Sequence, residues 1–425
     1  MSAPSIPPVR GARQTPPEPE HRPAWRSWRA SDLRGAMRLA AQATVGISRV
    51  AEGVHQSVLG TLGLPGGAAP GQARGLTGLI YRSIRGVTGL VDAGLQAGLA
   101  RLEPLWEADP ADGAVSWERE AVIAALNGVM GDRLEADGNP LCTEMQWCQH
   151  GRPLDLRRAT GSRLLVLVHG LCLNDLQWQR KGHDHGAFLA EALGYTPVYL
   201  RYNTGLHVSA NGERLNAMLA ALVRDWPTPL TEVSVLAHSM GGLVARSACA
   251  QAGADSLWRP LLRHLVFLGT PHHGAPLERA GHVVDVLLGQ SVYARPFARL
   301  ARLRSAGITD LRFGHVQASD WEGRDRFHRS TDRRAPLPLP ADVACHAVAG
   351  TLAAQRSPLA ERLVGDGLVP LRSALGQHDA PERTLAFARR DQAVLHRLGH
   401  LDLLSDPRVA RQLLAWLQPA GAVSG

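Results

Sequence analysis

Lysine is almost absent from this chain. Lys181 is its only lysine, although the sequence has 425 residues and a formal net charge of +8. The positive charge therefore comes almost wholly from arginine. The use of arginine in place of lysine throughout the sequence is typical of a codon bias rather than of a cationic surface with a binding role. The sequence also has no RNA- or DNA-binding motif, so we expect no nucleic-acid partner.

Cysteine is also scarce. The five cysteines are odd in number and scattered, without the short paired spacings of a zinc site, which favours structural thiols. A bridge from Cys142 to Cys148 would form only in an exported protein. The five cysteines are Cys142, Cys148, Cys172, Cys249 and Cys345.

Long apolar runs are missing as well. No stretch of about 18 uninterrupted apolar residues occurs, so we expect no transmembrane helix. The first 30 residues are rich in proline and arginine and contain no apolar segment of a secretory signal. We therefore expect a cytoplasmic or peripheral membrane location, and a disordered tail over residues 1–30.

A helical region is predicted over residues 31–140. Apolar residues recur near the helical period in 31–58 and again in 76–102, on either side of a Gly/Pro-rich break, which indicates a helical hairpin. A further helix is expected over 117–134. One interpretation packs the hairpin on the body of the protein; the alternative is a basic amphipathic surface in residues 31–104 that contacts a membrane.

Strand-like and helix-like segments alternate after residue 141. The Leu/Val run 163–168 is typical of a strand buried on both faces of a parallel sheet, and the alternation predicts a doubly wound α/β domain over 141–420. An interruption at 276–340 suggests a cap or lid. The expected strands are 145–150 and 154–157, paired as a hairpin, then 163–168, 197–202, 232–237, 264–268 and 343–348, with helices at 212–225, 241–252 and before Trp416.

Ser239 has the sequence context of an activated nucleophile. It lies between a predicted strand and a predicted helix, after Ala237-His238 and before Met240-Gly241-Gly242. Small residues at 237 and 241 permit the tight strand-to-helix turn, called a nucleophile elbow, that pushes a serine hydroxyl outward. Ala237 stands where a glycine is usual. A serine hydroxyl needs a neighbouring base, which is itself oriented by an acid.

The acid and the base are expected downstream, in the chain order Ser, Asp or Glu, His. Asp366 lies in the glycine-flanked stretch Gly365–Pro370, and a plain turn aspartate is the alternative role for it; Asp342 and Asp310 are the other acids considered. His400 precedes the terminal helix and is the predicted base. His396 is its main rival, and His378 also follows Asp366.

Two backbone amides are expected to form an oxyanion hole, which stabilises the negative charge of an acyl-transfer intermediate. The residue after the nucleophile, Met240, supplies one amide. Leu171 is the candidate for the other, because His169 and Gly170 end the strand 163–168 and shape the turn that follows.

Histidine pairs invite a metal hypothesis, at His183 and His185 and at His272 and His273. Neither pair has the i, i+4 spacing of a helical zinc pair. We therefore predict no metal ligands and no cofactor.

These residues resemble the bacterial lipases and the glycosylphosphatidylinositol inositol-deacylase-like hydrolases of the α/β-hydrolase superfamily. The resemblance covers about residues 165–405. It is carried by LVLVHGL (165–171), LRYNTG (200–205), LAHSMGGLVARSA (236–248), LVFLGTPHHGAP (265–276), GDGLVP (365–370) and GHLDLL (399–404).

The resemblance implies an α/β-hydrolase fold, a mostly parallel doubly wound sheet with a helical cap insertion and an N-terminal helical region. It also implies hydrolysis of a carboxylic ester, with a lipid ester as one substrate class, through an acyl-enzyme. Ser239, Asp366 and His400 would form the triad, and His238, Gly241, Thr270 and His272 would support the pocket. An acyltransferase with the same triad and a non-catalytic lipid- or partner-binding protein remain alternatives, and peptidase and lactonase activities share this apparatus.

Overall fold

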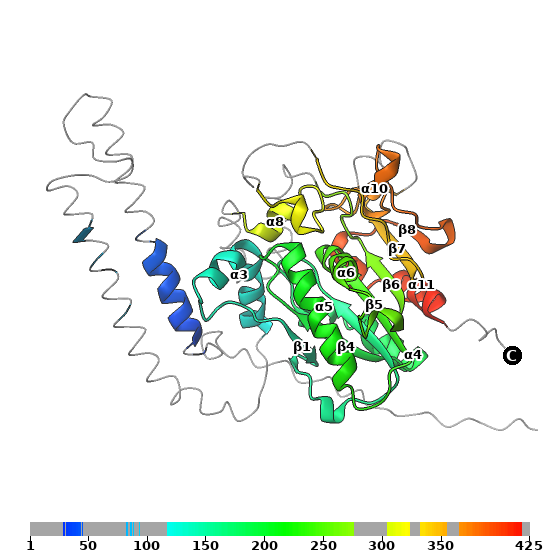
Figure 1. Cartoon of the computed structure of the whole chain (residues 1–425), viewed down its shortest axis with the longest axis horizontal. Coiled ribbons are helices and arrows are strands. Elements are labelled where there is room, and N and C mark those ends of the chain that lie inside the picture. Colours follow the sequence, from blue (N-terminus) through cyan, green and yellow to red (C-terminus); the bar gives the residue numbers. More distant parts are fainter. Residues whose placement is uncertain are drawn as a thin grey trace, which may run out of the picture.

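The computed structural model describes residues 31–43, 117–275, 304–323, 332–354 and 365–418, with a few single positions between 29 and 93. These residues form a central sheet with helices packed around it (Figure 1). The predicted tail, most of the predicted helical hairpin and much of the insertion at 276–340 lie outside the described residues.

Eight strands form one mixed sheet in the order β2-β1-β4-β3-β5-β6-β7-β8. All neighbours from β4 to β8 are parallel, whereas β1 pairs antiparallel with both β2 and β4. This is the mostly parallel sheet of the predicted α/β-hydrolase fold. The strands are β1 (Gln146–Gln149), β2 (Arg152–Pro153), β3 (Arg163–Val168), β4 (Thr196–Arg201), β5 (Glu232–His238), β6 (Leu262–Leu268), β7 (Ala344–Thr351) and β8 (Gln392–His396).

The connections place the switch point of the sheet between β3 and β5. The chain passes through α4 (His185–Leu193) to β4 on one side of β3, then through α5 (Val208–Asp225) to β5 on the other side. Because such crossovers are right-handed, reversing direction moves the helices to the opposite face. Thus α5 packs on α6 (Met240–Gln251) on one face and α4 packs on α11 (Pro407–Leu417) on the other (Figure 1). Open α/β sheets bind ligands at such a switch point.

The two strands that flank the switch point, β3 and β5, are buried from their second residue onward. Every residue of β3 after Arg163 and every residue of β5 after Glu232 is buried, as expected of a parallel sheet with helices on both faces. At the amino-terminal rim, Arg163 Nε lies 2.9 Å from Glu232 Oε2. The charged ends therefore stay at the rim, and the apolar runs form the core between the helix layers.

The hairpin near residue 150 forms, but the strand predicted at 154–157 is wrong. His150 and Gly151 have φ values of +52° and +75°, which make a tight two-residue turn. Pairing therefore begins at once, with Gln149 opposite Arg152, and residues 156–158 turn away into a short 3₁₀ helix.

The N-terminal region includes a helix over residues 31–43 that docks on α3 (Trp117–Ala136). The guanidinium of Arg119 holds the buried Asp32 with Nε 2.5 Å and Nη2 2.6 Å from its two carboxylate oxygens. Leu39 packs against apolar residues of α3 and the following loop. Among the described residues, no helix is both long and apolar enough to span a bilayer.

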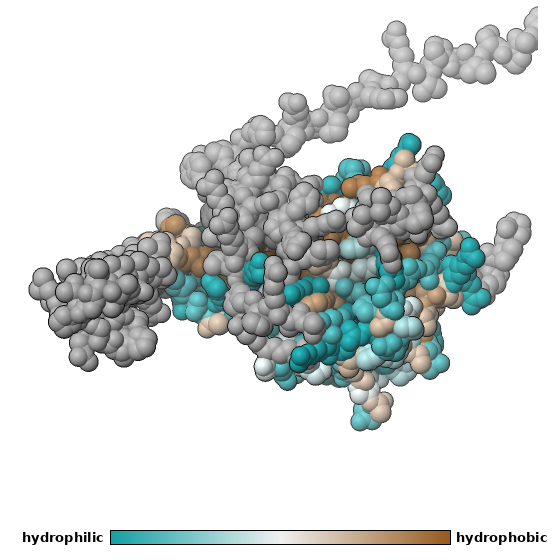
Figure 2. Space-filling model, turned by 90° about the horizontal axis from the view of Figure 1, so that it is seen from above, coloured by the Kyte–Doolittle hydropathy of each residue, from teal (hydrophilic) through white to brown (hydrophobic). Residues whose placement is uncertain are grey.

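Among the described residues, the exposed large apolar side chains are few and scattered. Figure 2 shows a face that is mostly hydrophilic over its lower half, with hydrophobic residues in smaller areas. Within the described residues, Leu33 and Trp117 of the N-terminal region are 43% and 42% exposed.

The described parts of the insertion pack on the body of the protein. Helix α8 (Ala306–Asp310) contacts α3, where Ser305 Oγ donates to the carbonyl of Gly128 at 2.6 Å. The buried Asp310 accepts the N–H of Val208 at the start of α5, at 2.8 Å. These contacts fix the beginning of the described segment 304–323 to α3 and to the start of α5.

Candidate active site

Ser239 lies in a strained turn between β5 and α6. Its φ is +55° and its ψ is −126°, a region that non-glycine residues rarely adopt and that is typical of a nucleophile elbow. Its N–H donates to the carbonyl of Leu268 at the end of β6, at 2.8 Å. The sheet therefore holds the backbone of Ser239 in place, and the residue is 8% exposed.

The glycines after Ser239 let α6 start against the sheet. A Cβ at Gly241 would lie 2.5 Å from the carbonyl oxygens of Val168 and His169. A Cβ at Gly242 would lie 2.0 Å from Oγ1 of Thr270. Only glycine fits at both positions, which explains the Gly-Gly pair in the motif.

Asp366 lies in a tight turn after β7. Its Oδ1 accepts the N–H groups of Leu368 and Val369 at 3.0 and 2.8 Å. Gly367 has a φ of +97°, so glycine suits this turn. These bonds fix one carboxylate oxygen and leave Oδ2 directed at another residue.

That residue is His400, at the start of the 3₁₀ helix His400–Leu404. Its Nδ1 lies 2.7 Å from Asp366 Oδ2, and both side chains are buried. The N–H of His400 also donates to the carbonyl of Asp366 at 3.0 Å. A carboxylate at Nδ1 favours the tautomer with its proton on Nδ1, which leaves Nε2 with a lone pair to accept a proton.

His238, the residue before the serine, contacts His400 directly. Its Nε2 lies 3.1 Å from the carbonyl oxygen of His400, and the two ring centroids are 4.7 Å apart. Burial and the neighbouring His400 hold the pKa of His238 well below 6.5, so this ring is neutral and donates through Nε2. The elbow and the histidine loop are therefore joined at the position next to Ser239.

The other acids and bases considered in the sequence lie in different environments. His396 is the last residue of β8, and His378 has Asp332 as its nearest carboxylate, at 4.0 Å. Asp310 contacts His207 and His315, while Asp342 is exposed in the turn before β7. Among these residues, the structure pairs only Asp366 with a histidine that adjoins the elbow.

The turn after β3 lies against the nucleophile. A Cβ at Gly170 would lie 2.9 Å from the Cβ of Ser239, so the turn approaches the serine as closely as glycine allows. Tyr202 braces it, because its hydroxyl donates to the carbonyl of His169 at 2.8 Å and its ring stacks on that of His169. Burial lowers the pKa of His169 to about 4, so this ring is also neutral.

The two amides proposed for an oxyanion hole belong to these facing segments. Leu171 follows Gly170, and the next residue, Cys172, has a φ of +58° and donates its N–H to Thr204 Oγ1 at 3.1 Å. Met240 is the first residue of α6. Amides in the first turn of a helix have no acceptor within the helix and are free to bind an anion.

Thr270 and His272, predicted to support the pocket, are both fully buried. Thr270 packs against Gly242, and His272 lies on the far side of the turn, with its Nδ1 3.5 Å from Nη1 of Arg246. Thr270 therefore positions α6, and His272 belongs to a separate cavity.

Gly269 is a site residue that the sequence analysis missed. Its φ is +59°, and a Cβ there would lie 3.1 Å from Asp366 Oδ2 and 3.2 Å from His400 Nδ1. Its N–H donates to the carbonyl of Val348 at 2.9 Å. The glycine in the Leu-Gly-Thr-Pro motif was the available signal, since it leaves room for the Asp366–His400 pair.

The histidine pairs considered as metal ligands have other partners. His183 Nε2 lies 2.8 Å from His185 Nδ1, and His185 Nε2 lies 3.0 Å from the carbonyl oxygen of Leu403. His273 Nε2 lies 3.0 Å from the carbonyl oxygen of Gly376. Within the described ranges, no three or more His, Cys, Asp or Glu side chains cluster as metal ligands.

Comparison with known proteins gives one family match and several similar structures. Residues 142–303 match a family described as a domain of unknown function, DUF7379. No curated protein matches the chain. The mature lipase BlEst2 of Bacillus licheniformis is 17% identical, with 65% of this chain and 98% of that chain covered and a TM-score of 0.41.

Two further similar structures come from an archaeon and a fungus. The esterase Pf2001 of Pyrococcus furiosus is 13% identical, with 60% of this chain and 84% of that chain covered and a TM-score of 0.33. Lipase B of Aspergillus fumigatus is 14% identical, with 64% of this chain and 55% of that chain covered and a TM-score of 0.34.

Proposed function

We propose that this protein is a serine hydrolase that cleaves carboxylic esters through an acyl-enzyme. The observation that carries the proposal is the buried pair of His400 and Asp366, 2.7 Å apart, beside a serine with a φ of +55° at the switch point of the sheet. A nucleophile, a base and an orienting acid at one edge of the sheet are the parts that acyl transfer needs.

In the proposed reaction, His400 Nε2 takes the proton of the Ser239 hydroxyl as its Oγ attacks the ester carbonyl. The carbonyl π electrons move to oxygen, and the amides of Leu171 and Met240 stabilise that charge. When the tetrahedral intermediate collapses, the C–O bond to the alcohol breaks and His400 gives its proton to the leaving alkoxide.

Water then attacks the acyl-enzyme in the same two steps, addition to the carbonyl and collapse of the intermediate. His400 takes a proton from water, the hydroxide adds to the acyl carbon, and the Ser239 Oγ leaves with the proton that His400 returns. Asp366 stays ionised throughout, keeps the imidazole in the required tautomer and stabilises its cation. Products are one acid and one alcohol for each water consumed.

The substrate class within the esters is a finer proposal. The Leu-Gly-Thr-Pro-His-His-Gly stretch at 268–274 and the Gly-Asp-Gly stretch at 365–367 resemble those of lipases. We therefore propose a lipid ester as the substrate, which predicts that turnover rises with acyl-chain length.

The test is hydrolysis of p-nitrophenyl esters from acetyl to palmitoyl by the wild type and by Ser239→Ala. We expect the substitution to lower kcat by a factor on the order of 10³–10⁶, because the nucleophile is lost. Ser162→Ala is the matched control, since Ser162 is exposed at the opposite end of β3. Labelling by a fluorophosphonate probe should be lost in the first variant and kept in the second.

Folded wild type that neither turns over any ester nor reacts with the probe would contradict the proposal. Activity confined to short chains would keep the serine hydrolase and reject the lipid substrate. Formation of a new ester in the presence of an added alcohol, with little free acid, would assign acyl transfer instead.

A further inference from the structure

Arg246 carries a positive charge into the interior of the protein. It lies two turns after Ser239 on α6 and is 5% exposed. Burial lowers the pKa of its guanidinium to about 10. The group is therefore still protonated near neutral pH, and its charge requires compensation.

The hydrogen-bond partners that the described residues provide for Arg246 are neutral. Nη2 donates to the carbonyl of Leu337 at 2.7 Å, and Nη1 lies 3.5 Å from Nδ1 of His272. Its Nε is buried and has no hydrogen-bond partner among the described residues. Burial and Arg246 itself keep the pKa of His272 well below 6.5, so this ring is neutral and brings no opposite charge.

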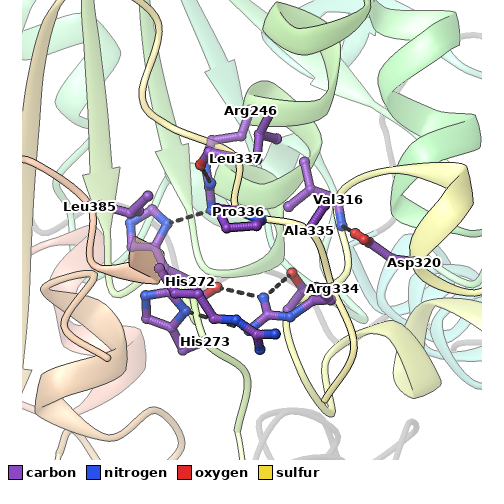
Figure 3. A pocket seen from close by; sticks show the side chains of 12 residues that line it. Arg246, His272, His273, Val316, Asp320, Arg334, Ala335, Pro336, Leu337 and Leu385 are labelled. Carbon is purple, nitrogen blue, oxygen red and sulfur yellow. Dashed lines mark hydrogen bonds between the residues drawn. The ribbon is translucent and has the colours of Figure 1, made fainter. Parts of the chain in front are cut away.

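A small cavity lies beside this guanidinium. Figure 3 shows Arg246 reaching from its helix toward Leu337 and the ring of His272, with His273 and Arg334 further along the cavity. The cavity has a volume of about 20 Å³. That is enough for a water molecule or an ion of similar size.

The walls of the cavity are positively charged. Arg246, Arg334 and Arg383 line it, and Asp320 is the acidic residue of the lining. Both Arg334 and Arg383 pair with one further carboxylate, Asp332, at 2.9 and 2.7 Å. Three arginines against two aspartates leave one positive charge.

The carboxylate of Asp320, the aspartate in the lining, already accepts hydrogen bonds from its own turn. Asp320 Oδ2 accepts the N–H groups of Val316 and Gln317 at 2.9 and 3.0 Å, which fixes it to its own turn. Asp320 acts on Arg246 through space and makes no hydrogen bond to it among the described residues, so the guanidinium has no charged hydrogen-bond partner there.

We propose that this cavity binds a small monovalent anion of the class of chloride, with Arg246 as its main ligand. The anion would offset the charge of the buried guanidinium and accept a hydrogen bond from it. The proposal does not depend on ester hydrolysis, because no residue of the cavity belongs to the proposed triad or oxyanion hole.

The position of the site gives the anion a structural role. Arg246 belongs to the helix that starts at the nucleophile, while Arg334 comes from the insertion and donates to the carbonyls of His272 and Gly314 at 3.1 and 2.8 Å. An anion between these groups would tie α6 to the described insertion segments. Its binding should therefore stabilise the folded protein.

The experiment measures thermal unfolding of the full chain at constant ionic strength, with sodium chloride or sodium bromide replacing sodium gluconate. Gluconate is too large for the cavity. We expect the Tm to rise with the logarithm of the halide concentration once this exceeds the Kd, since a ligand at 100 times its Kd shifts a folding equilibrium about 100-fold. Arg246→Met should abolish the rise, while Arg224→Met, which removes an exposed arginine of α5, should keep it.

A direct measurement guards against a variant that fails to fold. Wild-type crystals soaked in bromide should show an anomalous peak within hydrogen-bond distance of the Arg246 guanidinium. A peak there, with a Tm rise in halide that Arg246→Met abolishes, supports the site. No peak there, a rise that gluconate reproduces, or an equal rise in Arg246→Met would overturn it.

Discussion

At the scale of single residues, Asp366 has two separate tasks. One carboxylate oxygen accepts the amides of Leu368 and Val369, and the other contacts Nδ1 of His400. The first task shapes the turn and the second sets the imidazole tautomer. A substitution that keeps the size of the side chain separates them.

We predict that Asp366→Asn folds but loses a factor on the order of 10³–10⁴ in kcat toward a p-nitrophenyl ester. The amide oxygen can still accept from Leu368 and Val369, while an NH₂ group facing Nδ1 favours the wrong tautomer. Asp342→Asn, at an exposed turn, is the matched control. A variant within about tenfold of wild type would argue against Asp366 as the orienting acid.

Gly269 shows how a residue without a reactive side chain protects the site. We predict that Gly269→Ala lowers stability and also kcat, because its Cβ would lie 2.7 Å from Leu403 Cδ1 and crowd the Asp366–His400 pair. Gly138→Ala is the control: its φ of +54° carries similar backbone strain, with nothing within 4 Å of the added carbon.

Both glycine variants should lose about 1–2 kcal/mol from the positive φ alone. Urea unfolding measures that common cost, and ester turnover measures the effect on the site. Equal turnover in the two folded variants would contradict the role assigned to Gly269.

At the scale of elements, the sequence predicted the buried strands well. The Leu/Val run of β3 was assigned with the bounds that the structure has, and β5 and β6 differ by one or two residues. Such strands are surrounded on both faces, so their apolar pattern is continuous and local. β8 was missed because its residues are only half-buried and include Gln392 and His396.

Sequence motifs predicted the separate turns of the candidate site, but not the contacts between those turns. The serine turn, the Gly-Asp-Gly turn and the His-Gly turn each have a signature within a few residues. Contacts between distant turns have none, so neither the close approach of Gly269 to Asp366 nor the contact of His238 with His400 was expected. Arg246 and its cavity were missed for the same reason, since the partners come from several separate segments.

The docking of residues 31–43 on α3 depends on one buried carboxylate. Asp32 accepts from the Nε and Nη2 of Arg119 and from the N–H of Arg29. Hydrogen bonds to charged groups contribute about 1.5–3 kcal/mol each, and removing the Asp32 carboxylate would take two of them from Arg119 and leave its pair with Glu120. We predict that Asp32→Ala raises amide hydrogen exchange in 31–43 by about 100-fold or more.

The same experiment carries its own controls. Exchange in β3 and β5 should stay as in the wild type, because the central sheet does not depend on this contact. Asp155→Ala, which removes an exposed partner of Arg157, should leave 31–43 unchanged. Unchanged exchange in 31–43 of the Asp32 variant would show that apolar packing alone holds this helix.

At the scale of the whole molecule, the interior holds many neutral histidines. Burial is the first cause that lowers each pKa, and for His169 and His185 the value falls to about 4. The unfolded chain takes up protons near pH 6.5, before the folded chain does, so stability falls as the pH drops below that value. The histidines with lowered pKa are His169, His185, His238, His264, His272, His273 and His346.

We therefore predict that the free energy of unfolding falls steeply between pH 7 and pH 5, a window above the range in which most carboxylates titrate. A group that titrates at about 6.5 unfolded and about 4 folded loses about 2 kcal/mol at pH 5. His185→Gln keeps a polar side chain near the carbonyl of Leu403 and removes that titration. Urea unfolding should show a pH 7 to pH 5 difference smaller than in the wild type by about 2 kcal/mol, whatever the variant loses at pH 7. The exposed His150→Asn variant should keep the full difference, and an undiminished difference in His185→Gln would mean that this buried ring does not contribute to acid lability.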